Sequence, residues 1–137
     1  MPCDPAAFAA AWASALADSP WFPANAATWT HGAVSLTIDD GDASFSLRLD
    51  LHAGELRALA PCAPDEARAA RFRLKAPREA WQRVLSGELD PMKAILAQDL
   101  HLTGRLGVLA PYVRAAQELA AAALEAVKRL DTPSPPE

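Results

Sequence analysis

The sequence predicts an α+β protein with a five-stranded, mostly antiparallel sheet that has one face covered by helices. Apolar and polar residues alternate with a period of two from Val34 to Leu51 and again from Arg71 to Lys75, which is typical of strands with one buried and one exposed face. Elsewhere apolar residues recur at helical spacing behind prolines, which favour the first turn of a helix. The apolar stripe of each helix has to be buried against the sheet or another helix. The prolines that begin these segments are Pro5, Pro77, Pro91 and Pro111.

Length and composition favour a single globular domain. The chain has 137 residues, 51% hydrophobic and 22% charged, and a formal net charge of -4, values close to those of average soluble domains. We expect one domain over residues 1–130 and a disordered, proline-rich tail over residues 131–137. The negative charge argues against nucleic acid as a partner. No targeting segment and no apolar run of the ~20 residues that span a bilayer is present, so the expected location is the cytoplasm.

The N-terminal segment predicts an amphipathic helix. Asp4 is a suitable N-cap ahead of a proline, and Phe8, Trp12 and Leu16 follow at helical spacing until Pro20 ends the pattern. The next ten residues contain further prolines and predict a loop held against the core. Its large aromatic residues are Trp21, Phe22 and Trp29.

The centre of the chain predicts a three-stranded antiparallel meander. Apolar residues alternate with polar ones in residues 34–38 and 45–51, and the Asp-Asp-Gly-Asp segment at 39–42 is a turn between them. A second turn, His-Ala-Gly at 52–54, leads into a short strand at 55–60. Such a meander has one apolar and one polar face.

The second half predicts two more strands and three helices. Residues 61–70 carry the chain across to a fourth strand at Arg71–Lys75, in which Phe72 and Leu74 share one face. A helix then runs from Pro77 to Gly87, and Asp90 caps another that carries apolar residues at 92, 95 and 96. The final elements are a short strand that contains Leu100 and Leu102 and a long helix from Pro111 to about Leu130.

Side chains that could perform catalysis or bind a metal are scattered along the sequence. His31, His52 and His101 are far apart and have no metal-ligand spacing. Cys3 and Cys62 form no CxxC pair, and we expect both to be free thiols. No catalytic residue, metal site or cofactor is predicted.

A row of cations lies along the predicted fourth strand. Arg71, Arg73 and Lys75 alternate with apolar residues and are joined by Arg78 and by Arg48 from another strand. These side chains could bind a phosphate-bearing headgroup, coenzyme A or a membrane surface. Alternatively they form a solvated sheet face, as happens wherever one side of a strand meets water.

Residues 72–109 resemble the sterol carrier protein 2 (SCP-2) domain family. The resemblance rests on the strand, the helix with bulky Trp81 ahead of Gly87, the second helix behind Asp90, and the spacing to Ala94 and Gly104. A weaker match upstream, over residues 29–59, extends it to most of the chain. The resemblance implies a free-standing, bacterial-type member: a small α+β domain enclosing a hydrophobic tunnel. It further implies binding, and transfer, of sterols, fatty acids, fatty acyl-CoA or isoprenoid lipids without catalysis.

Two departures from the family pattern affect what can be carried over. Gln98 and Asp99 stand where many relatives have a Gly-Lys pair, so a headgroup contact by that pair is not expected. The chain ends in Pro-Pro-Glu rather than in a Ser-Lys-Leu-like tripeptide, so peroxisomal targeting is not expected.

The expected lipid-binding wall comes from the paired helices, the last strand and the start of the final helix. The alternative to a lipid site is that these residues are plain core, and that the apolar faces serve a protein-interaction or dimerisation module associated with a lipid-metabolising enzyme. The expected partner is a small hydrophobic lipid, and the sequence leaves open a monomer or homodimer and transient contact with a membrane or partner enzyme. The candidate wall residues are Trp81, Leu85, Met92, Ile95, Leu96, Leu100, Leu102, Leu106, Leu109, Tyr112, Val113 and Ala116.

Overall fold

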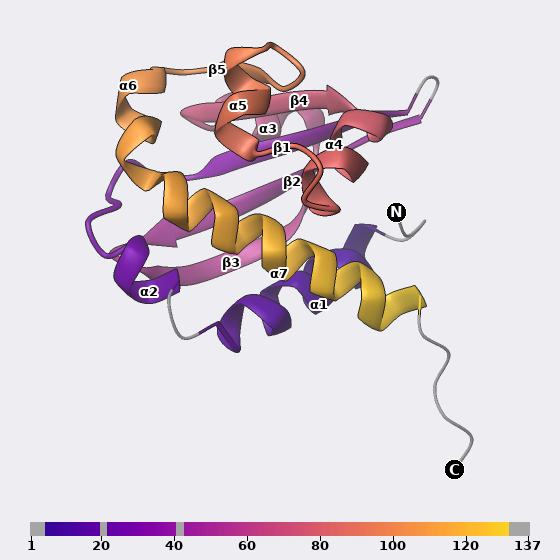
Figure 1. Cartoon of the computed structure of the whole chain (residues 1–137), viewed down its shortest axis with the longest axis horizontal. Coiled ribbons are helices and arrows are strands. Elements are labelled where there is room, and N and C mark those ends of the chain that lie inside the picture. Colours follow the sequence, from indigo (N-terminus) through magenta and orange to yellow (C-terminus); the bar gives the residue numbers. More distant parts are fainter. Residues whose placement is uncertain (1–4, 20–21, 41–42, 132–137) are drawn as a thin grey trace.

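The computed structural model describes residues 5–19, 22–40 and 43–131. In this part of the chain a five-stranded sheet carries most of the helices on one face (Figure 1). The elements are α1 (Pro5–Ala17), α2 (Phe22–Asn25), β1 (Val34–Asp40), β2 (Ala43–His52), β3 (Glu55–Cys62), α3 (Pro64–Ala69), β4 (Phe72–Pro77), α4 (Arg78–Leu85), α5 (Pro91–Leu96), β5 (His101–Thr103), α6 (Leu106–Leu109), the 3-10 helix η1 (Ala110–Tyr112) and α7 (Val113–Asp131).

The strands lie in the order β3-β2-β1-β4-β5. β1, β2 and β3 form the expected antiparallel meander, whereas β4 is parallel to β1 and antiparallel to β5. The parallel pair arises because the chain crosses over between β3 and β4, and a parallel neighbour needs such a connection. The predicted α+β fold with a mostly antiparallel, five-stranded sheet is confirmed.

The register of the strands separates an apolar from a polar face. Leu36 in β1 lies opposite Leu47 in β2 and Leu74 in β4. Leu36 and Leu47 are buried. One residue earlier, Ser35 lies opposite Arg73 in β4, and these side chains project to the other face because successive residues alternate.

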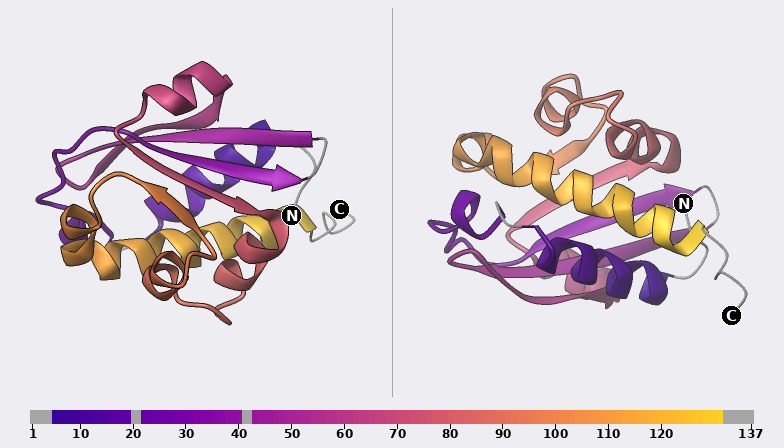
Figure 2. Two further views of the ribbon diagram at one scale, coloured as in Figure 1. Left: turned by 90° about the horizontal axis from the view of Figure 1, so that it is seen from above. Right: turned by 60° about the horizontal axis from the view of Figure 1, so that its bottom comes forward.

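The crossover contains a helix that the sequence pattern did not predict. α3 lies on the side of the sheet opposite to α4 and α7, at the top of the left view in Figure 2. Its backbone is held to the sheet by the hydroxyl of Ser35, which is 1% exposed and donates to the carbonyl oxygen of Ala67 at 2.9 Å. The other helices, α4 and α7 among them, cover the apolar face of the sheet and form the hydrophobic core with it. α3 covers part of the polar face.

α7 lies along α1, and both helices rest above the apolar face of the sheet (Figures 1 and 2). Trp12 in α1 donates its indole N–H to the carbonyl oxygen of Leu119 in α7 at 3.0 Å. Arg129 in α7 binds Asp18 just beyond α1 at 3.1 Å. Small alanine side chains on the facing sides, Ala123 among them at 1% exposed, let the two helices approach closely. α7 contacts α1 far more extensively than it contacts α4 or α5.

The residues between α1 and β1 form more than the predicted loop. α2 is a short helix in this segment, and Phe22 and Trp29 are buried as expected, at 2% and 3% exposed. Trp21 lies outside the described residues, as do Asp4, Cys3, Gly41 and Asp42 of the 39–42 turn, and residues 132–137 of the expected tail. Cys62 is a free thiol.

The predicted start of α5 and end of α4 agree with the structure, whereas the final helix begins later than predicted. Asp90 caps α5, since its carboxylate accepts from the N–H groups of Met92 and Lys93. Gly87, with φ of +83°, follows α4. The final helix begins at Val113, after α6 and η1, rather than at Pro111. Among the described helices, none combines the length and the apolar character that a bilayer crossing requires.

The β2–β3 turn requires glycine at residue 54. Ala53 and Gly54 have φ of +50° and +85°, the arrangement of a two-residue hairpin turn with both central residues left-handed. A Cβ atom added at Gly54 would lie 2.4 Å from the carbonyl oxygen of Pro23. The turn is therefore packed against the start of α2.

Candidate functional site

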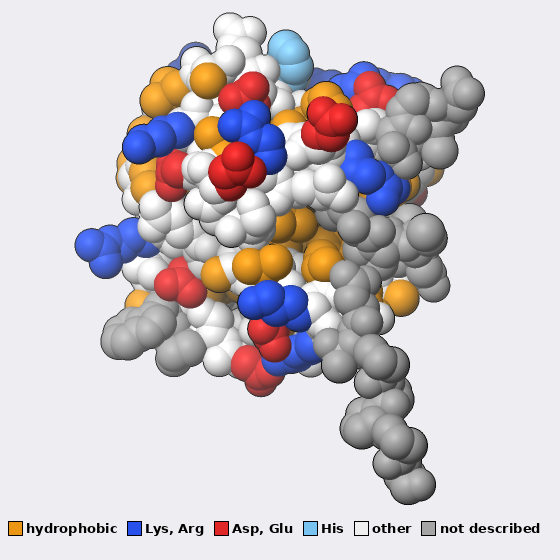
Figure 3. Space-filling view, turned by 45° about the vertical axis from the view of Figure 1, so that its right-hand side comes forward, with side chains coloured by type: hydrophobic (Ala, Val, Ile, Leu, Met, Phe, Trp, Pro, Cys, Tyr) orange, Lys and Arg blue, Asp and Glu red, His pale blue; other side chains and the backbone are white. Residues whose placement is uncertain are grey.

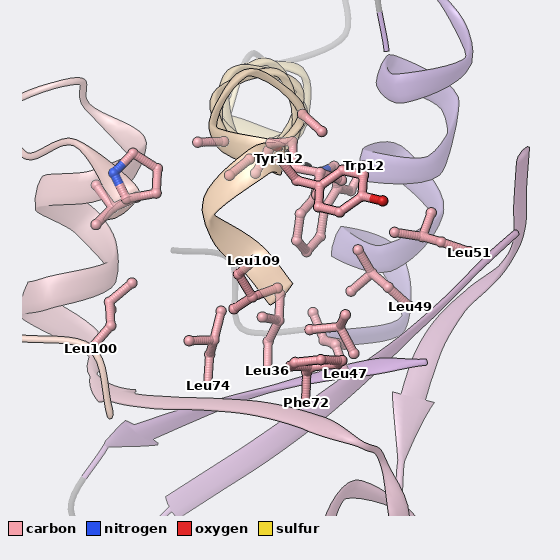
Figure 4. Close-up of a pocket in the computed structure, with 18 of the residues that line it drawn as sticks. Trp12, Leu36, Leu47, Leu49, Leu51, Phe72, Leu74, Leu100, Leu109 and Tyr112 are labelled. Carbon is pink, nitrogen blue, oxygen red and sulfur yellow. Dashed lines mark hydrogen bonds between the residues drawn. The ribbon is translucent and has the colours of Figure 1, made fainter. Parts of the chain in front are cut away.

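A cavity of about 150 Å³ lies between the apolar face of the sheet and the helices. Figure 4 shows Leu36, Leu47 and Leu74 rising from the strands towards α7. Trp12 and Tyr112 form the opposite side, from α1 and from the turn that precedes α7. The cavity is thus enclosed between the sheet and helices that come from both ends of the chain.

The tryptophans in the wall present their rings to the cavity while their only polar atoms are satisfied by backbone. Trp12 binds the Leu119 carbonyl, Trp29 donates to the carbonyl oxygen of Gly32 at 2.9 Å, and Trp81 donates to that of Thr37 at 3.1 Å. A buried indole N–H without an acceptor would be costly and would attract water. With each N–H bonded, the tryptophan walls behave as hydrocarbon.

The remainder of the described wall is aliphatic or aromatic, and none of its residues is charged. Water in such a cavity finds almost no hydrogen-bond partners in the wall. The site can therefore hold hydrocarbon by burial alone, which is non-directional and gives little discrimination between apolar guests.

The hydroxyl of Tyr112 is the polar group at one end of the cavity. It shares a hydrogen bond of 2.9 Å with the hydroxyl of Thr28, at an exposed position. The ring packs edge-on against Trp29, with centroids 5.0 Å apart. This arrangement places an exposed pair of hydroxyls beside an apolar wall.

The α5–α7 seam at the cavity is bridged by Asp90. Besides capping α5, its carboxylate accepts from the side-chain amide of Gln117 in α7 at 2.9 Å. The Gln117 hydrogen bond, followed by those from the Lys93 and Met92 N–H groups, lowers the pKa of Asp90, although partial desolvation opposes the shift.

The face in Figure 3 shows hydrophobic side chains gathered at its centre and framed by charged ones. Among the residues that the structure describes, the exposed large hydrophobic ones are Leu96 at 67% and Leu130 at 38%. Within residues 5–19, 22–40 and 43–131, no three His, Cys, Asp or Glu residues converge in a way that could hold a metal ion.

A model of the SCP-2 sterol transfer family matches residues 13–117. The chain belongs to the SCP-2 sterol transfer family. The matched segment runs from α1 into α7 and so contains both sides of the cavity. A comparison with curated proteins gives no match.

Solved structures share this SCP-2 fold. A crystal structure of sterol carrier protein 2 is 32% identical, with a TM-score of 0.77 over 88% of this chain and 95% of that one. A conserved hypothetical protein from Thermus thermophilus, for which a sterol carrier identity has been suggested, is also 32% identical, with a TM-score of 0.75 over 88% and 86%. The Aedes aegypti sterol carrier protein 2 in complex with palmitate, a C16 fatty acid, is 17% identical, with a TM-score of 0.50 over 84% and 98%.

The structure brings most of the expected wall residues together around the cavity of the SCP-2 domain. Met92 and Ile95, one helical turn apart on α5, both face it. The expected wall residues that line the cavity are Trp81, Leu85, Met92, Ile95, Leu100, Leu109, Tyr112 and Ala116. Their contact with a lipid remains a prediction.

The other expected wall residues lie elsewhere. Leu96 follows Ile95 by one position, which turns its side chain about 100° around a helix, and it is 67% exposed. Val113 is displaced from Tyr112 in the same way. Leu102 lies on the edge strand β5, and Leu106 lies in the short helix α6. None of these residues lines the cavity.

The sheet and α1 supply wall residues that were expected to be core. Leu36, Leu47 and Leu49 on the apolar face line the cavity, as do Phe8 and Trp12 of α1. The period of two identified the strand positions, and the helical spacing identified those of α1. The pattern could not separate residues that face a void from residues that face each other, because both environments are apolar.

Proposed function

We propose that this SCP-2 domain binds a hydrophobic lipid, such as a fatty acid, a fatty acyl-CoA, a sterol or an isoprenoid, in its apolar cavity and transfers it without chemical change. The observation that carries the proposal is a cavity wall of hydrocarbon in which Trp12, Trp29 and Trp81 each give their N–H to backbone carbonyls. Such a wall offers a polar substrate little hydrogen bonding, whereas burial of an apolar ligand against it lowers the free energy substantially.

The energetics of the cavity favour occupation. An empty cavity of 150 Å³ destabilises a protein by about 4 kcal/mol at ~24 cal/mol per Å³. Typical domains have only ~5–15 kcal/mol of stability. A lipid tail recovers this loss and gains ~0.8 kcal/mol for each CH₂ group that it buries. Binding to the folded protein should therefore stabilise it.

The cavity must widen to take a whole lipid, because sites for ligands of that class measure roughly 300–1,000 Å³. We infer that it widens at the seam between α7 and the α4–α5 pair. α7 is bound to α1 by the Trp12 and Arg129 hydrogen bonds and contacts α4 and α5 much less. The seam would open while α1 and α7 move together.

We propose binding without catalysis because of the residue types that line the cavity. Among the described residues that line the cavity, none is a serine, cysteine, histidine, lysine or carboxylate. Nucleophilic and acid–base catalysis need such groups within hydrogen-bond reach of the substrate. The palmitate complex of the Aedes aegypti protein supports a fatty acid as the first ligand to test.

The proposal is tested by matched substitutions on α7. Ala120 lines the cavity, whereas its neighbour Ala121 is exposed. Ala120→Leu fills the void, and we expect it to weaken binding of a fluorescent fatty acid at least about tenfold, since an added buried side chain competes for the same space. Ala121→Leu makes the same change outside the cavity and should bind normally. Equal affinity of both folded variants and the parent would overturn the proposal.

The same preparation tests the interaction-module alternative. Lipid extraction followed by mass spectrometry should find a fatty acid or isoprenoid in the purified protein. Size-exclusion chromatography over a range of concentrations measures whether the chain dimerises. A dimer that contains no lipid and binds no probe would favour the interaction module instead.

A further inference from the structure

A second recess, of about 530 Å³, lies on the opposite side of the sheet from the lipid cavity. Its floor is the polar face of the strands, and α3 forms one border through Pro64, Ala67 and Arg68. Figure 2 shows α3 alone on this side of the sheet, away from α4 and α7. We call it the α3 groove. The cavity and the α3 groove are separated by the sheet itself.

The strand register places cations and hydroxyls side by side on the floor of the α3 groove. In one row Ser35 lies next to Arg73, which lies next to Thr103 in β5. In the following row Thr37 lies next to Lys75, and Lys75 next to His101. All six of these residues line the α3 groove, and they place polar and cationic side chains at neighbouring positions, although the Ser35 hydroxyl already donates to the Ala67 carbonyl oxygen: Ser35, Arg73, Thr103, Thr37, Lys75 and His101.

The positive charges of Arg73 and Lys75 in the α3 groove are not neutralised by the residues that line it. None of the described residues that line it is a carboxylate. Of the α3 carboxylates, Asp65 binds Arg68 at the border of the α3 groove, and Glu66 accepts the N–H of Ala63 at 3.4 Å. The side chains of Arg73 and Lys75 form no ion pair or hydrogen bond with the described part of the chain.

Arg73 distinguishes the α3 groove from an ordinary solvated sheet face. Its Nε atom is buried and has no acceptor among the described residues. A buried donor left without an acceptor destabilises the protein, more so when it is charged, so such an atom calls for a partner that the described residues do not supply. A cation that simply faced solvent would have water around that atom.

We propose that the α3 groove is a second ligand site, for a soluble small molecule that bears a phosphate or pyrophosphate group. Arginine and lysine are the side chains that bind phosphate oxygens best, arginine through parallel N–H groups and lysine as a point charge. The hydroxyls of Thr37 and Ser46, 2.8 Å apart, share one hydrogen bond, which leaves one proton free for a phosphate oxygen. The volume lies within the usual range for small-molecule sites.

A small molecule fits the α3 groove better than a membrane surface does. A bilayer is flat on this scale, whereas the cationic rows lie in a recess beside α3. The chain also has a net charge of -4, which opposes its approach to an anionic membrane. Because the sheet separates the two sites, this proposal does not depend on lipid occupying the cavity.

The test uses inorganic pyrophosphate and isothermal titration calorimetry at low ionic strength, where surface charge is least screened. We expect Arg73→Gln and Lys75→Gln each to weaken binding about tenfold, the size of one charge-assisted hydrogen bond. Lys75 is exposed, so its variant should fold even if the Arg73 variant does not. Arg114→Gln, on the exposed side of α7 in the other layer, removes the same charge and should bind as the parent does.

Three outcomes would overturn the proposal. The parent protein fails to bind pyrophosphate, or Arg114→Gln weakens binding as much as Lys75→Gln does, which would show a general charge effect. The third is that the chain binds phosphatidylglycerol vesicles through Lys75 but does not bind pyrophosphate, which would assign this face to membranes. Ala120→Leu should leave pyrophosphate binding unchanged, so failure of the lipid proposal is recognised separately.

Discussion

The indole N–H of Trp12 donates to the carbonyl oxygen of Leu119 at 3.0 Å across 107 positions of sequence. Both residues line the apolar cavity. The hydrogen bond therefore joins α1 to α7 at the wall itself and sets the distance between the helices there. It also leaves the Trp12 ring, rather than its polar edge, against the cavity.

Replacing Trp12 by phenylalanine should lower the free energy of unfolding by about 1 kcal/mol beyond the loss of ring area, the usual net value of one hydrogen bond. Urea unfolding measures this change. Hydrogen exchange should become faster in α7, because its tie to α1 is lost. Trp29→Phe is the matched control, since its indole bond runs to Gly32 within the same segment. Equal exchange in α7 of the two variants would contradict this role of Trp12.

Asp90 should contribute to stability both as a cap and as a charged acceptor. Its carboxylate accepts from the backbone of α5 and from Gln117 in α7. Asp90→Ala removes all of these bonds, and we expect a loss of about 1 kcal/mol for the cap alone. Thermal or urea unfolding at neutral pH measures it. Asp90→Asn retains a good cap without the charge and should lose less.

The same residue gives a pH dependence with a defined sign. The Gln117 hydrogen bond, above all, lowers the pKa of Asp90 in the folded protein. The charged form is then the stabilised one, so its contribution is present above the unfolded pKa of about 3.9 and is lost as pH falls through the lower folded value. Asp90→Asn should lack this component between about pH 4 and the acid limit of folding. An unchanged slope of stability against pH in that variant would rule it out.

The sequence predicted individual strands and helices better than it predicted the tertiary contacts that join them to the sheet. Alternation identified β1, β2 and β4 because one face of each is apolar, and Asp90 identified the start of α5 because its carboxylate is a cap. α3 escaped prediction, since its short sequence, Pro-Asp-Glu-Ala-Arg-Ala, contains no large apolar side chain that could form a stripe. It is held by tertiary contact, the Ser35 hydroxyl bond to Ala67, which no local pattern records.

The cavity shows a similar limit. Met92 and Ile95 were expected in its wall from their spacing on α5, and they line it. Leu36 and Leu47 were recognised only as buried strand residues, because a void and a packed core present the same apolar pattern. The phosphate site proposed in the α3 groove could be foreseen only as a row of cations. The burial of the Arg73 Nε is a feature of the folded structure that the row of cations does not indicate.

Glycines 32 and 54 separate backbone strain from steric crowding. They have nearly the same φ, +88° and +85°, but a Cβ at Gly32 meets nothing within 4 Å, whereas one at Gly54 lies 2.4 Å from the Pro23 carbonyl oxygen. Gly32→Ala should cost about 1 kcal/mol for the left-handed conformation. Gly54→Ala should cost clearly more, because the backbone of α2 must also move. Denaturant midpoints compare the two, and similar losses would mean that the β2–β3 turn is not packed against α2 in solution.

Tyr112 should select lipids with an acidic headgroup if the cavity binds lipid as proposed. Its hydroxyl lies at an exposed end of the apolar wall and shares a hydrogen bond with Thr28 at 2.9 Å. A carboxylate at that end would accept a hydrogen bond from the Tyr112 hydroxyl, whereas a methyl ester would accept a weaker one. Tyr112→Phe should therefore reduce the preference for palmitate over methyl palmitate by about fivefold, the equivalent of ~1 kcal/mol, in a probe-displacement assay.

Thr28→Ala is the matched control for this prediction. It removes the partner of the Tyr112 hydroxyl but leaves that hydroxyl free to meet the headgroup, so the preference for the acid should be kept or increased. A Tyr112→Phe protein that binds both lipids with the parent's ratio would place the headgroup elsewhere. The α5–α7 seam beside Gln117 would then be the end of the cavity to examine, because the Asp90 carboxylate there would repel an acid and favour a neutral or cationic headgroup.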